Sequence, residues 1–283
     1  MHKIGRFAIV TPYAREPREV LERCVESVRT QTISADHFFV SDGFPQDWLD
    51  QAGVKHIRLG HAHHDFGNTP RGIGALLAVS QGYDAIGFLD ADNWYDREHV
   101  CACCDVAHSA APADVVIAKR RMLLGDGTPL AFPEEPGHVD TNCFWFLSGA
   151  FHLLHYWANM PPPFAPFGDR VFNRMIHARR LTVRHAQATT VNYVSGWAGH
   201  YRAVGKTPPP SAKPNIDVGP AVEWICGLDP RQQRLVANRC GVHPIVVWAE
   251  VISRPAIDRD ANCPCGSGDR YLRCHGDVAV ALN

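Results

Sequence analysis

The chain has 283 residues, of which 46% are hydrophobic and 20% are charged. This length suits one sizeable α/β core, or such a core with a small appendage, and the composition excludes a disordered or fibrous protein. The 28 Lys and Arg residues nearly balance the 29 Asp and Glu residues, which excludes the strongly basic character of a dedicated nucleic-acid-binding protein.

No stretch of the sequence approaches the roughly 18 apolar residues of a membrane-spanning helix, so we expect no membrane span. The apolar run Phe7–Val10 near the N-terminus is too short for a secretory signal, and we therefore expect a cytoplasmic protein. In that reducing compartment, ten cysteines favour metal ligands or free thiols over disulfides.

Strand-like and helix-like segments alternate through the first half of the chain. Apolar runs that end in polar or turn residues predict strands at residues 7–10, 37–41, 54–59, 85–89 and 115–117. Apolar residues at helical spacing predict helices at residues 20–28, 69–82 and 96–109. This alternation predicts an α/β fold with a mostly parallel sheet, whose ligands lie at the carboxyl ends of the strands.

The alternation stops after about residue 125. Further strands are predicted at residues 143–147 and 181–194, and helices at 151–157, at 170–179 and, as one or two helices, within 223–257. The segment 195–220 is rich in Pro and Gly and is interpreted as a lid or linker. We divide the chain into a catalytic domain, a linker or helical extension and a C-terminal module, at residues 1–215, 216–257 and 258–283.

A pair of carboxylates follows the strand predicted at residues 85–89. Asp90 and Asp92 are two residues apart, so in an extended backbone their side chains face the same side. They repel each other unless a cation lies beside them, and Mg²⁺ or Mn²⁺ is bound by such hard oxygen ligands together with substrate phosphates. The alternative is a solvated turn at the end of the strand, since Asp is a common turn residue.

Four segments together resemble the family 2 glycosyltransferases of the GT-A fold. They are Phe7-Ala-Ile-Val-Thr-Pro12, Val40-Ser-Asp-Gly43, the helix from Asn68 to Gly82, and Gly87-Phe-Leu-Asp-Ala-Asp-Asn-Trp-Tyr95. The similarity covers roughly residues 6 to 200. It implies a nucleotide-diphospho-sugar transferase fold and a metal-dependent, inverting transfer of sugar from a nucleoside-diphosphate sugar, in our interpretation a UDP-sugar, to an acceptor hydroxyl.

The resemblance also implies a donor site. Thr11 and Pro12 match the turn where the first strand meets the nucleotide. Asp42 matches the acid that binds the base or ribose, and Arg71 lies at a position near the donor.

The same resemblance assigns the two neighbouring aspartates. Asp90 and Asp92 match the Asp-x-Asp that contacts the ribose and the Mn²⁺ or Mg²⁺ on the diphosphate, with Asp92 as the direct ligand. Such a cation neutralises the charge that develops on the leaving oxygen. Members of the fold also bring a His to the metal, for which His200 and His185 are the candidates.

Inverting transfer needs a base that takes a proton from the acceptor hydroxyl. The segment Phe167-Gly168-Asp169-Arg170 matches in part the family motif that supplies it, with one acid where the family often has two. Asp169 is therefore the candidate catalytic base. The alternative is an Asp that only stabilises the first turn of its helix.

Two further clusters are interpreted as structural. His61-Ala-His63-His64-Asp65 is interpreted as a loop after the third strand, with metal chelation as the alternative. Cys101, Cys103 and Cys104 are scattered around the predicted helix and are interpreted as small buried residues.

The C-terminal segment carries three thiols and one imidazole, at Cys263, Cys265, Cys274 and His275. Cys₃His is a known tetrahedral Zn²⁺ ligand set, and a segment this small needs a metal to fold. The pattern is very similar to the SEC-C motif, a short zinc module, in which Zn²⁺ is held at these four positions. Arg270, Tyr271 and Arg273 leave a surface suited to a protein or nucleic-acid partner.

The leading hypothesis is a glycosyltransferase acting on an unknown acceptor, which would be a saccharide, a protein or a small molecule. One alternative is a non-catalytic nucleotide-sugar-binding adaptor that recruits a partner through the zinc module. The other is a sugar-nucleotide hydrolase or nucleotidyltransferase on a related sheet. Nucleoside diphosphate release in the presence and absence of an acceptor distinguishes the three.

Overall fold

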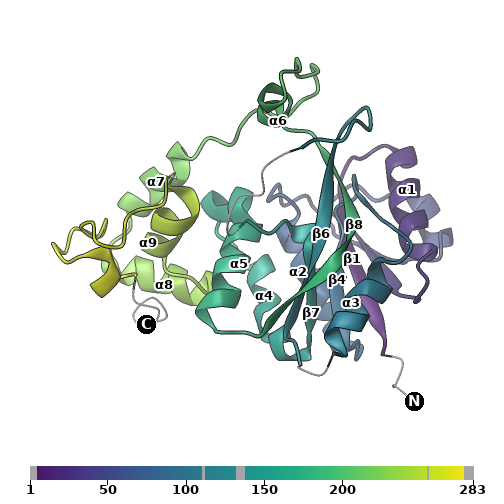
Figure 1. The fold of residues 1–283 in the computed structure, drawn as a ribbon, viewed down its shortest axis with the longest axis horizontal. Coiled ribbons are helices and arrows are strands. Elements are labelled where there is room, and N and C mark those ends of the chain that lie inside the picture. Colours follow the sequence, from purple (N-terminus) through teal and green to yellow (C-terminus); the bar gives the residue numbers. More distant parts are fainter. Residues whose placement is uncertain (1–4, 110–111, 132–137, 254, 277–283) are drawn as a thin grey trace.

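A single eight-stranded sheet forms the centre of the computed structural model, which describes residues 5–109, 112–131, 138–253 and 255–276. The strand order is β3-β2-β1-β4-β7-β6-β8-β5, and helices cover both faces (Figure 1). The last residues of the predicted module, 277–283, lie outside the described part of the chain.

The first half builds a parallel sheet with crossover helices, as predicted. Its strands are β1 (Phe7–Tyr13), β2 (Asp36–Ser41), β3 (Lys55–Arg58) and β4 (Ala85–Phe88), and its helices are α1 (Arg18–Arg29), α2 (Asn68–Ser80) and α3 (His99–Ala107). β1 lies between β2 and β4 and is parallel to both, so the carboxyl ends of these strands meet at one edge. The N-cap of α2 is Gly67, in the left-handed region at φ 77°, two residues before residue 69, where the sequence predicts that the helix begins.

The second half adds strands of both directions. They are β5 (Trp94–Tyr95), β6 (Val115–Leu124), β7 (Phe144–Leu147) and β8 (Val183–Ser195). β7 is antiparallel to both β4 and β6, whereas β6 and β8 run parallel, so the sheet is mixed but mostly parallel. β6 is much longer than the predicted strand at 115–117, because it continues beyond Ala118 with partly exposed polar residues that pair with β8 after two shifts in register.

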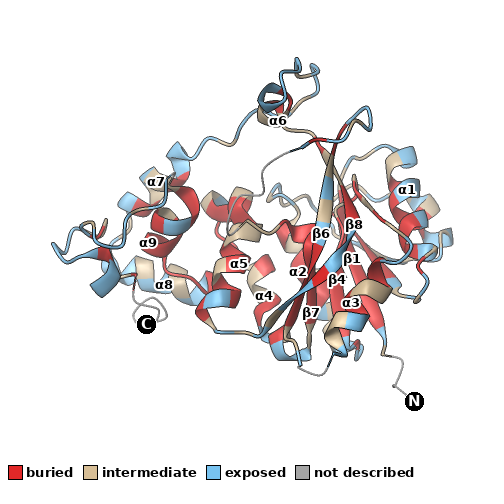
Figure 2. Ribbon diagram, viewed as in Figure 1, coloured by how far each residue is buried: buried red, intermediate tan, exposed pale blue. Residues whose placement is uncertain are grey.

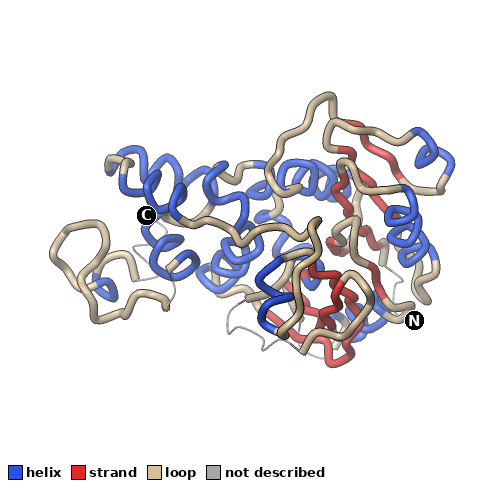
Figure 3. Tube along the Cα trace, turned by 90° about the horizontal axis from the view of Figure 1, so that it is seen from above, coloured by secondary structure: helices blue, strands red, loops and turns tan. Residues whose placement is uncertain are grey.

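The remaining elements form a helical part beside the sheet (Figures 1 and 3). Its α-helices are α4 (His155–Ala158), α5 (Gly168–Ala178), α7 (Gly219–Cys226), α8 (Pro230–Cys240) and α9 (Pro244–Val246). A further helix, α6 (Ala198–Ala203), lies apart from them beyond the end of β8 (Figure 1). α9 continues directly into a π-helix, η5 (Val247–Ile252). Short 3₁₀ turns complete the fold, at η1 (Asp47–Gln51), η2 (Thr141–Cys143), η3 (Ser148–Leu153), η4 (Pro162–Phe167) and η6 (Tyr271–Arg273). The helix predicted at 151–157 is divided between η3 and α4.

The core lies on both faces of the sheet, and many of the residues coloured as buried in Figure 2 belong to its strands and to α5. On one face, Gly87 of β4 leaves room for Trp145, since a Cβ on Gly87 would lie 2.7 Å from that ring. On the other face, Gly74 brings α2 against β1, where a Cβ would lie 2.6 Å from Val10. Trp157 of α4 stacks on Phe172 of α5 with ring centroids 3.8 Å apart. Close packing on this second face holds α5 beside the carboxyl edge of the sheet.

Among the described residues, no single helix has the length and apolar character needed to cross a bilayer. One consecutive pair, Pro230–Cys240 with Pro244–Ile252, meets these criteria only when taken together, and it bends by 79° at the break.

Two buried histidines make the fold sensitive to acid. His37 bonds through Nε2 to the Thr11 hydroxyl at 2.8 Å, and His99 bonds through Nδ1 to the Thr190 hydroxyl at 2.8 Å. Burial lowers the pKa of both to about 3. The unfolded chain binds protons at these side chains below a pH of about 6.5, whereas the folded chain does not.

We therefore expect stability to fall as the pH decreases from 6.5 towards 3, with each histidine contributing up to about 1.4 kcal/mol per pH unit. His99→Asn, which keeps a polar atom near Nδ1, should reduce that slope by one such contribution in urea unfolding between pH 7.5 and pH 5. His185→Asn, at an exposed position on β8, is the control and should keep the slope. An unchanged slope in His99→Asn would contradict this account.

Candidate active site and C-terminal metal cluster

A cavity of about 1260 Å³ lies at the carboxyl edge of the sheet. The ends of β1, β2 and β4 form its floor, and residues from α5, the 196–216 segment and the end of η5 form its walls. Of the residues predicted from the sequence, it is lined by Pro12, Asp42, Arg71, Asp90, Asp92, Asp169 and His200. The structure therefore gathers seven predicted side chains from six separate segments around one cavity.

Thr11 is not among the lining residues. Its side chain is fully buried and bonds to His37 beneath α1, so its predicted place beside the nucleotide is not where the structure puts it. The physical reason is the alternation of side chains along β1, which sends Thr11 to the face covered by α1. Pro12 lies at the cavity and packs closely against Gly67.

Asp42 is held in place by the loop that carries the histidine cluster. Its carboxylate accepts hydrogen bonds from the His63 backbone N–H at 3.0 Å and from His63 Nδ1 at 2.6 Å. His64 and Phe66 of the same loop adopt left-handed φ values of 55° and 60°. The cluster is thus a loop, as interpreted, and His63 acts on Asp42, a role that its sequence pattern did not reveal.

Asp90 is fixed by two partners. Arg71 Nη2 donates to Asp90 Oδ1 at 2.7 Å, and Asn142 Nδ2 donates to Asp90 Oδ2 at 3.0 Å. Arg71 is itself only 4% exposed and lies over the ring of Trp157 at 4.9 Å. An Arg on the first turn of α2 and an Asn on η2 therefore share one carboxylate, which cannot turn away from the cavity.

Asp92 has a different environment from Asp90. Within the described part of the chain, its carboxylate has no ion-pair partner. Burial, together with the neighbouring charge of Asp90, raises the pKa of Asp92 to about 6, while the charge of Lys213 opposes this shift. A buried carboxylate beside a second carboxylate is stabilised as an anion when a cation lies next to it. These donor atoms fit a hard divalent ion such as Mg²⁺ or Mn²⁺.

The Pro- and Gly-rich segment after β8 folds back over the cavity. The Lys213 N–H donates to the Gly196 carbonyl at 2.7 Å, and the Ala198 N–H donates to the Lys213 carbonyl at 2.8 Å. This backbone pairing places both His200 and Lys213 on the cavity wall. His200 Nδ1 lies 2.6 Å from the Ser195 hydroxyl, which fixes the orientation of the ring.

His185, the other histidine considered for a metal, does not reach this site. It lies on β8, exposed to solvent and away from the residues that line the cavity. Of the two candidates, only His200 lines the cavity that Asp92 also lines.

Asp169 occupies the first turn of α5 on the opposite wall. Its Oδ1 accepts from the Arg170 N–H at 2.7 Å, and its Oδ2 lies 3.0 Å from His138 Nε2. Burial lowers the pKa of His138, but the hydrogen bond and charge of Asp169 outweigh this effect and leave the pKa raised. Asp169 and His138 therefore form a pair in which the imidazole orients the carboxylate.

A chain of polar residues crosses the floor of the cavity. Arg120 Nη1 pairs with Asp140 Oδ2 at 3.0 Å, and Asp140 Oδ1 accepts from Asn142 Nδ2 at 2.6 Å. Since the same Asn142 amide reaches Asp90, this chain spans the cavity floor from β6 to β4. Sequence reasoning missed His138, Asp140, Asn142, Arg120 and Lys213. They stand in no motif, and only the fold brings them to the site.

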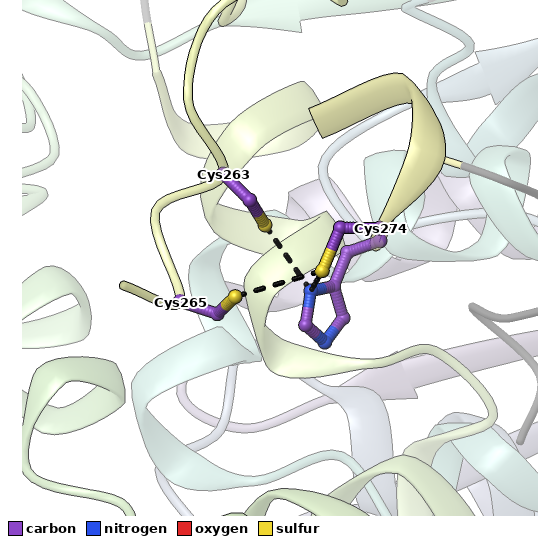
Figure 4. Close-up of side chains that lie close together, drawn as sticks. Cys263, Cys265 and Cys274 are labelled. Atoms are coloured by element: carbon purple, nitrogen blue, oxygen red, sulfur yellow. Dashed lines mark hydrogen bonds between the residues drawn. The ribbon is translucent and has the colours of Figure 1, made fainter. Parts of the chain in front are cut away.

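The four predicted zinc ligands converge at the end of the helical part (Figure 4). Cys263 Sγ and Cys274 Sγ each lie 3.2 Å from His275 Nδ1, and Cys265 Sγ lies 3.6 Å from Cys274 Sγ. All four ligand atoms lie within 4.8 Å of one another. A tetrahedral Zn²⁺ with Zn–S bonds of about 2.3 Å requires sulfur atoms about 3.8 Å apart, so the cluster fits that ion.

The described residues contain no second group of Cys, His, Asp and Glu side chains assembled in this way. Asp90, Asp92 and His200 thus line a cavity without forming a closed ligand set. Cys103 and Cys104 are buried in α3, in agreement with their interpretation as small core residues, whereas Cys101 is only partly buried and its thiol lies 3.7 Å from the Asp105 carboxylate.

One family model and several solved structures are similar to this chain. The model of the family described as "Glycosyl transferase family 2" matches residues 8–181. No curated protein sequence is significantly similar to the chain.

Among solved structures, the fold is similar to that of S. aureus TarS 1-349. For its complex with UDP-GlcNAc, the TM-score is 0.54 at 12% identity, covering 98% of this chain and 82% of that one. For its complex with UDP, the TM-score is 0.54 at 14% identity, covering 87% and 72%. For TarS 1-349 without a named ligand, it is 0.51 at 14% identity, covering 82% and 69%.

At such low identity these likenesses establish the fold, which is that of the GT-A transferases. The family match covers more than half of the chain and includes β1, α2 and the Asp90–Asp92 pair. The chain belongs to glycosyl transferase family 2.

Proposed function

We propose that this protein transfers a sugar from a UDP-sugar to an acceptor hydroxyl with inversion at the anomeric carbon. The observation that carries the proposal is that Asp92, half-buried and without an ion-pair partner among the described residues, lines the same cavity as Asp169 on the opposite wall. Two of the similar TarS structures are complexes with UDP and UDP-GlcNAc, which supports a uridine nucleotide as the donor.

The donor would lie across the carboxyl ends of β1, β2 and β4. Asp42 is placed to accept a hydrogen bond from the base or ribose, while Pro12 shapes the wall beside it. Arg71 holds Asp90 rather than pointing at the donor, so its role is to fix the carboxylate pair. Lys213 is an exposed cation on the lid close enough to Asp92 to lower its pKa, and it would bind the diphosphate.

Asp92, with His200 on the lid, would hold a divalent cation. When bound, that ion supplies charge neutralisation of the departing diphosphate. The chain's own contribution is to fix Asp90 through Arg71 and Asn142, which leaves the Asp92 carboxylate to the ion. Closure of the 196–216 segment over the cavity would exclude water and so favour transfer over hydrolysis.

Asp169 would take the proton of the acceptor hydroxyl. Hydrogen bonds donated by the Arg170 N–H and by His138 Nε2 fix both of its oxygens, so the carboxylate is held in one orientation. A base positioned in this way contributes typically about 10²- to 10⁴-fold to the rate. The single acid suffices here because His138 supplies the orienting contact.

We further propose that the C-terminal cluster binds Zn²⁺ through Cys263, Cys265, Cys274 and His275. Burial raises the pKa of Cys263 to about 12, so that a bound cation is needed to stabilise its thiolate at neutral pH.

The cation site can be tested with Asp92→Asn. We expect kcat/KM for transfer to fall by at least about 10³-fold, because the ion supplies several kcal/mol of charge stabilisation. Calorimetry with UDP and Mn²⁺ should show weaker binding, and the Mn²⁺-dependent part of the UDP affinity should disappear. Asp47→Asn, at a side chain 90% exposed near β3, is the matched control. Equal Mn²⁺-dependent affinity in Asp92→Asn and the wild type would contradict the proposal.

The base can be tested with Asp169→Asn. We expect UDP binding to be retained and transfer to fall by about 10²- to 10⁴-fold, because the amide cannot take the proton. His138→Gln keeps the carboxylate and should give a smaller loss. UDP formation is measured with and without acceptors. Release without an acceptor would indicate a hydrolase, binding without release an adaptor, and full transfer by Asp169→Asn would remove the assignment of the base.

The zinc site can be tested by metal analysis of protein purified under reducing conditions. We expect one zinc ion per chain, and Cys274→Ser should lose it because only three ligands remain. Cys226→Ser, at an exposed thiol outside the cluster, should keep the metal. Zinc-free wild-type protein would refute the site.

A further inference from the structure

We propose that the C-terminal metal module braces α5, the helix that carries Asp169, and that Glu250 is the positioning residue through which it acts. The assignment of a catalytic consequence rests on the proposed function of Asp169, whereas the mechanical connection stands on contacts within the chain. A module that served only to recruit a partner would not need these contacts.

The first contact is made by Tyr271, which lies within the loop of metal ligands. The sequence analysis places Tyr271 on a surface for a partner, and this expectation is wrong, because the side chain is only 1% exposed. Its hydroxyl donates to Glu250 Oε1 at 2.7 Å. The backbone around it is tied to the module, since the Tyr271 N–H donates to Ala261 at 2.8 Å and its carbonyl accepts from Gly276 at 2.7 Å. Loss of the metal would therefore release the ring from its place.

Glu250 connects Tyr271 to α5. While Oε1 accepts from Tyr271, Oε2 accepts from Arg174 Nε in an ion pair whose side chains are 30% and 16% exposed. Arg174 lies five residues after Asp169, which is about one and a half turns along the same helix. One carboxylate thus joins the metal module to the helix of the candidate base.

Glu250 also lies on an element that forms part of the cavity. η5 packs against α5, and Val251, Ile252 and Ser253 at its end line the cavity. The Ile257 N–H donates to the Ala249 carbonyl at 3.0 Å, which ties the chain leading to the module back onto η5. A π-helix of this kind is marginally stable by itself, so its shape depends on such contacts.

The metal ligands themselves face the protein on one side. The rings of His275 and His243 lie with centroids 4.3 Å apart, and Cys263 is buried. His243 Nδ1 in turn accepts from the Ile245 N–H at the start of α9. The cluster is therefore seated on the helices that precede η5, while Leu272 and Arg273 remain exposed on the opposite side.

The test uses the full chain and measures amide hydrogen exchange, which requires no activity. Removal of the metal by a chelator should speed exchange in α5 and η5 by about 10-fold or more, because each lost hydrogen bond to a charged group weakens local protection by that order. Exchange in α1 and α3, on the far face of the sheet, should not change. Unchanged exchange in α5 after removal of the metal would overturn the proposal.

Tyr271→Phe separates the brace from metal binding. It keeps the ring and all four ligands, so we expect the zinc content of the wild type together with exchange in α5 that is about 10-fold faster. Glu250→Gln keeps an acceptor for Tyr271 and removes the ion pair with Arg174, and it should give the same direction of change. Asp260→Asn, which removes an exposed ion pair within the module, is the matched control and should leave α5 unchanged.

Kinetics then show whether the brace positions Asp169. Tyr271→Phe should lower kcat for transfer and leave the affinity for UDP and Mn²⁺ unchanged, because the ends of β2 and β4 are not part of the connection. A loss of UDP affinity equal to the loss of kcat would indicate general unfolding and overturn the positioning role. If no acceptor supports transfer, the proposed function fails, while the exchange experiment still decides the brace.

Discussion

The ion pair between Arg71 and Asp90 is the constraint on which the site depends. Two aspartates at the end of β4 repel each other, and the fold gives hydrogen-bond and ion-pair partners to only one of them. Asp90 receives Arg71 on one oxygen and the Asn142 amide on the other, whereas Asp92 has no ion-pair partner in the described structure. This asymmetry makes one carboxylate part of the scaffold and leaves the other to a cation.

The constraint reaches into both halves of the molecule. Arg71 belongs to α2 and packs on Trp157 of α4, so the same residue connects the nucleotide-binding half to the helices of the other wall. Asn142 bonds Asp90 and Asp140, and Asp140 pairs with Arg120 of β6. Asp90 and Asp140 therefore each have a cationic partner, in contrast to Asp92.

Much of the fold could be predicted because its signals are local. The apolar runs ending at Asp42 and Asp90 identify parallel strands, and their order brings both carboxylates to one edge. β5 and the long extension of β6 were missed, since two residues carry no periodicity and the polar half of β6 has little apolar pattern. The mixed direction of β7 depends on pairing between distant segments, which no local pattern encodes.

The residues of the candidate site also fall into two groups: those that a local sequence pattern identifies and those that only the fold brings together. Cys263, Cys265, Cys274 and His275 lie close in sequence, so spacing alone predicted their cluster, and their convergence confirms it. His138 and Lys213 could not be found in this way, because a single His or Lys has no distinguishing neighbours. Thr11 is the opposite case, because it fits the family motif but does not line the cavity. The alternation of side chains along β1 turns its hydroxyl towards His37.

The contacts between the metal module and the helix of Asp169 could not be predicted by sequence comparison. A short zinc motif at the end of a chain is naturally taken as a separate attachment, and Leu272 and Arg273 of this module remain exposed. Here its buried side holds Tyr271 against Glu250, and Glu250 against the helix of Asp169. Partner binding on the exposed side and support of α5 on the buried side are compatible. A partner that distorts the module would thereby change the position of the candidate base without touching the cavity.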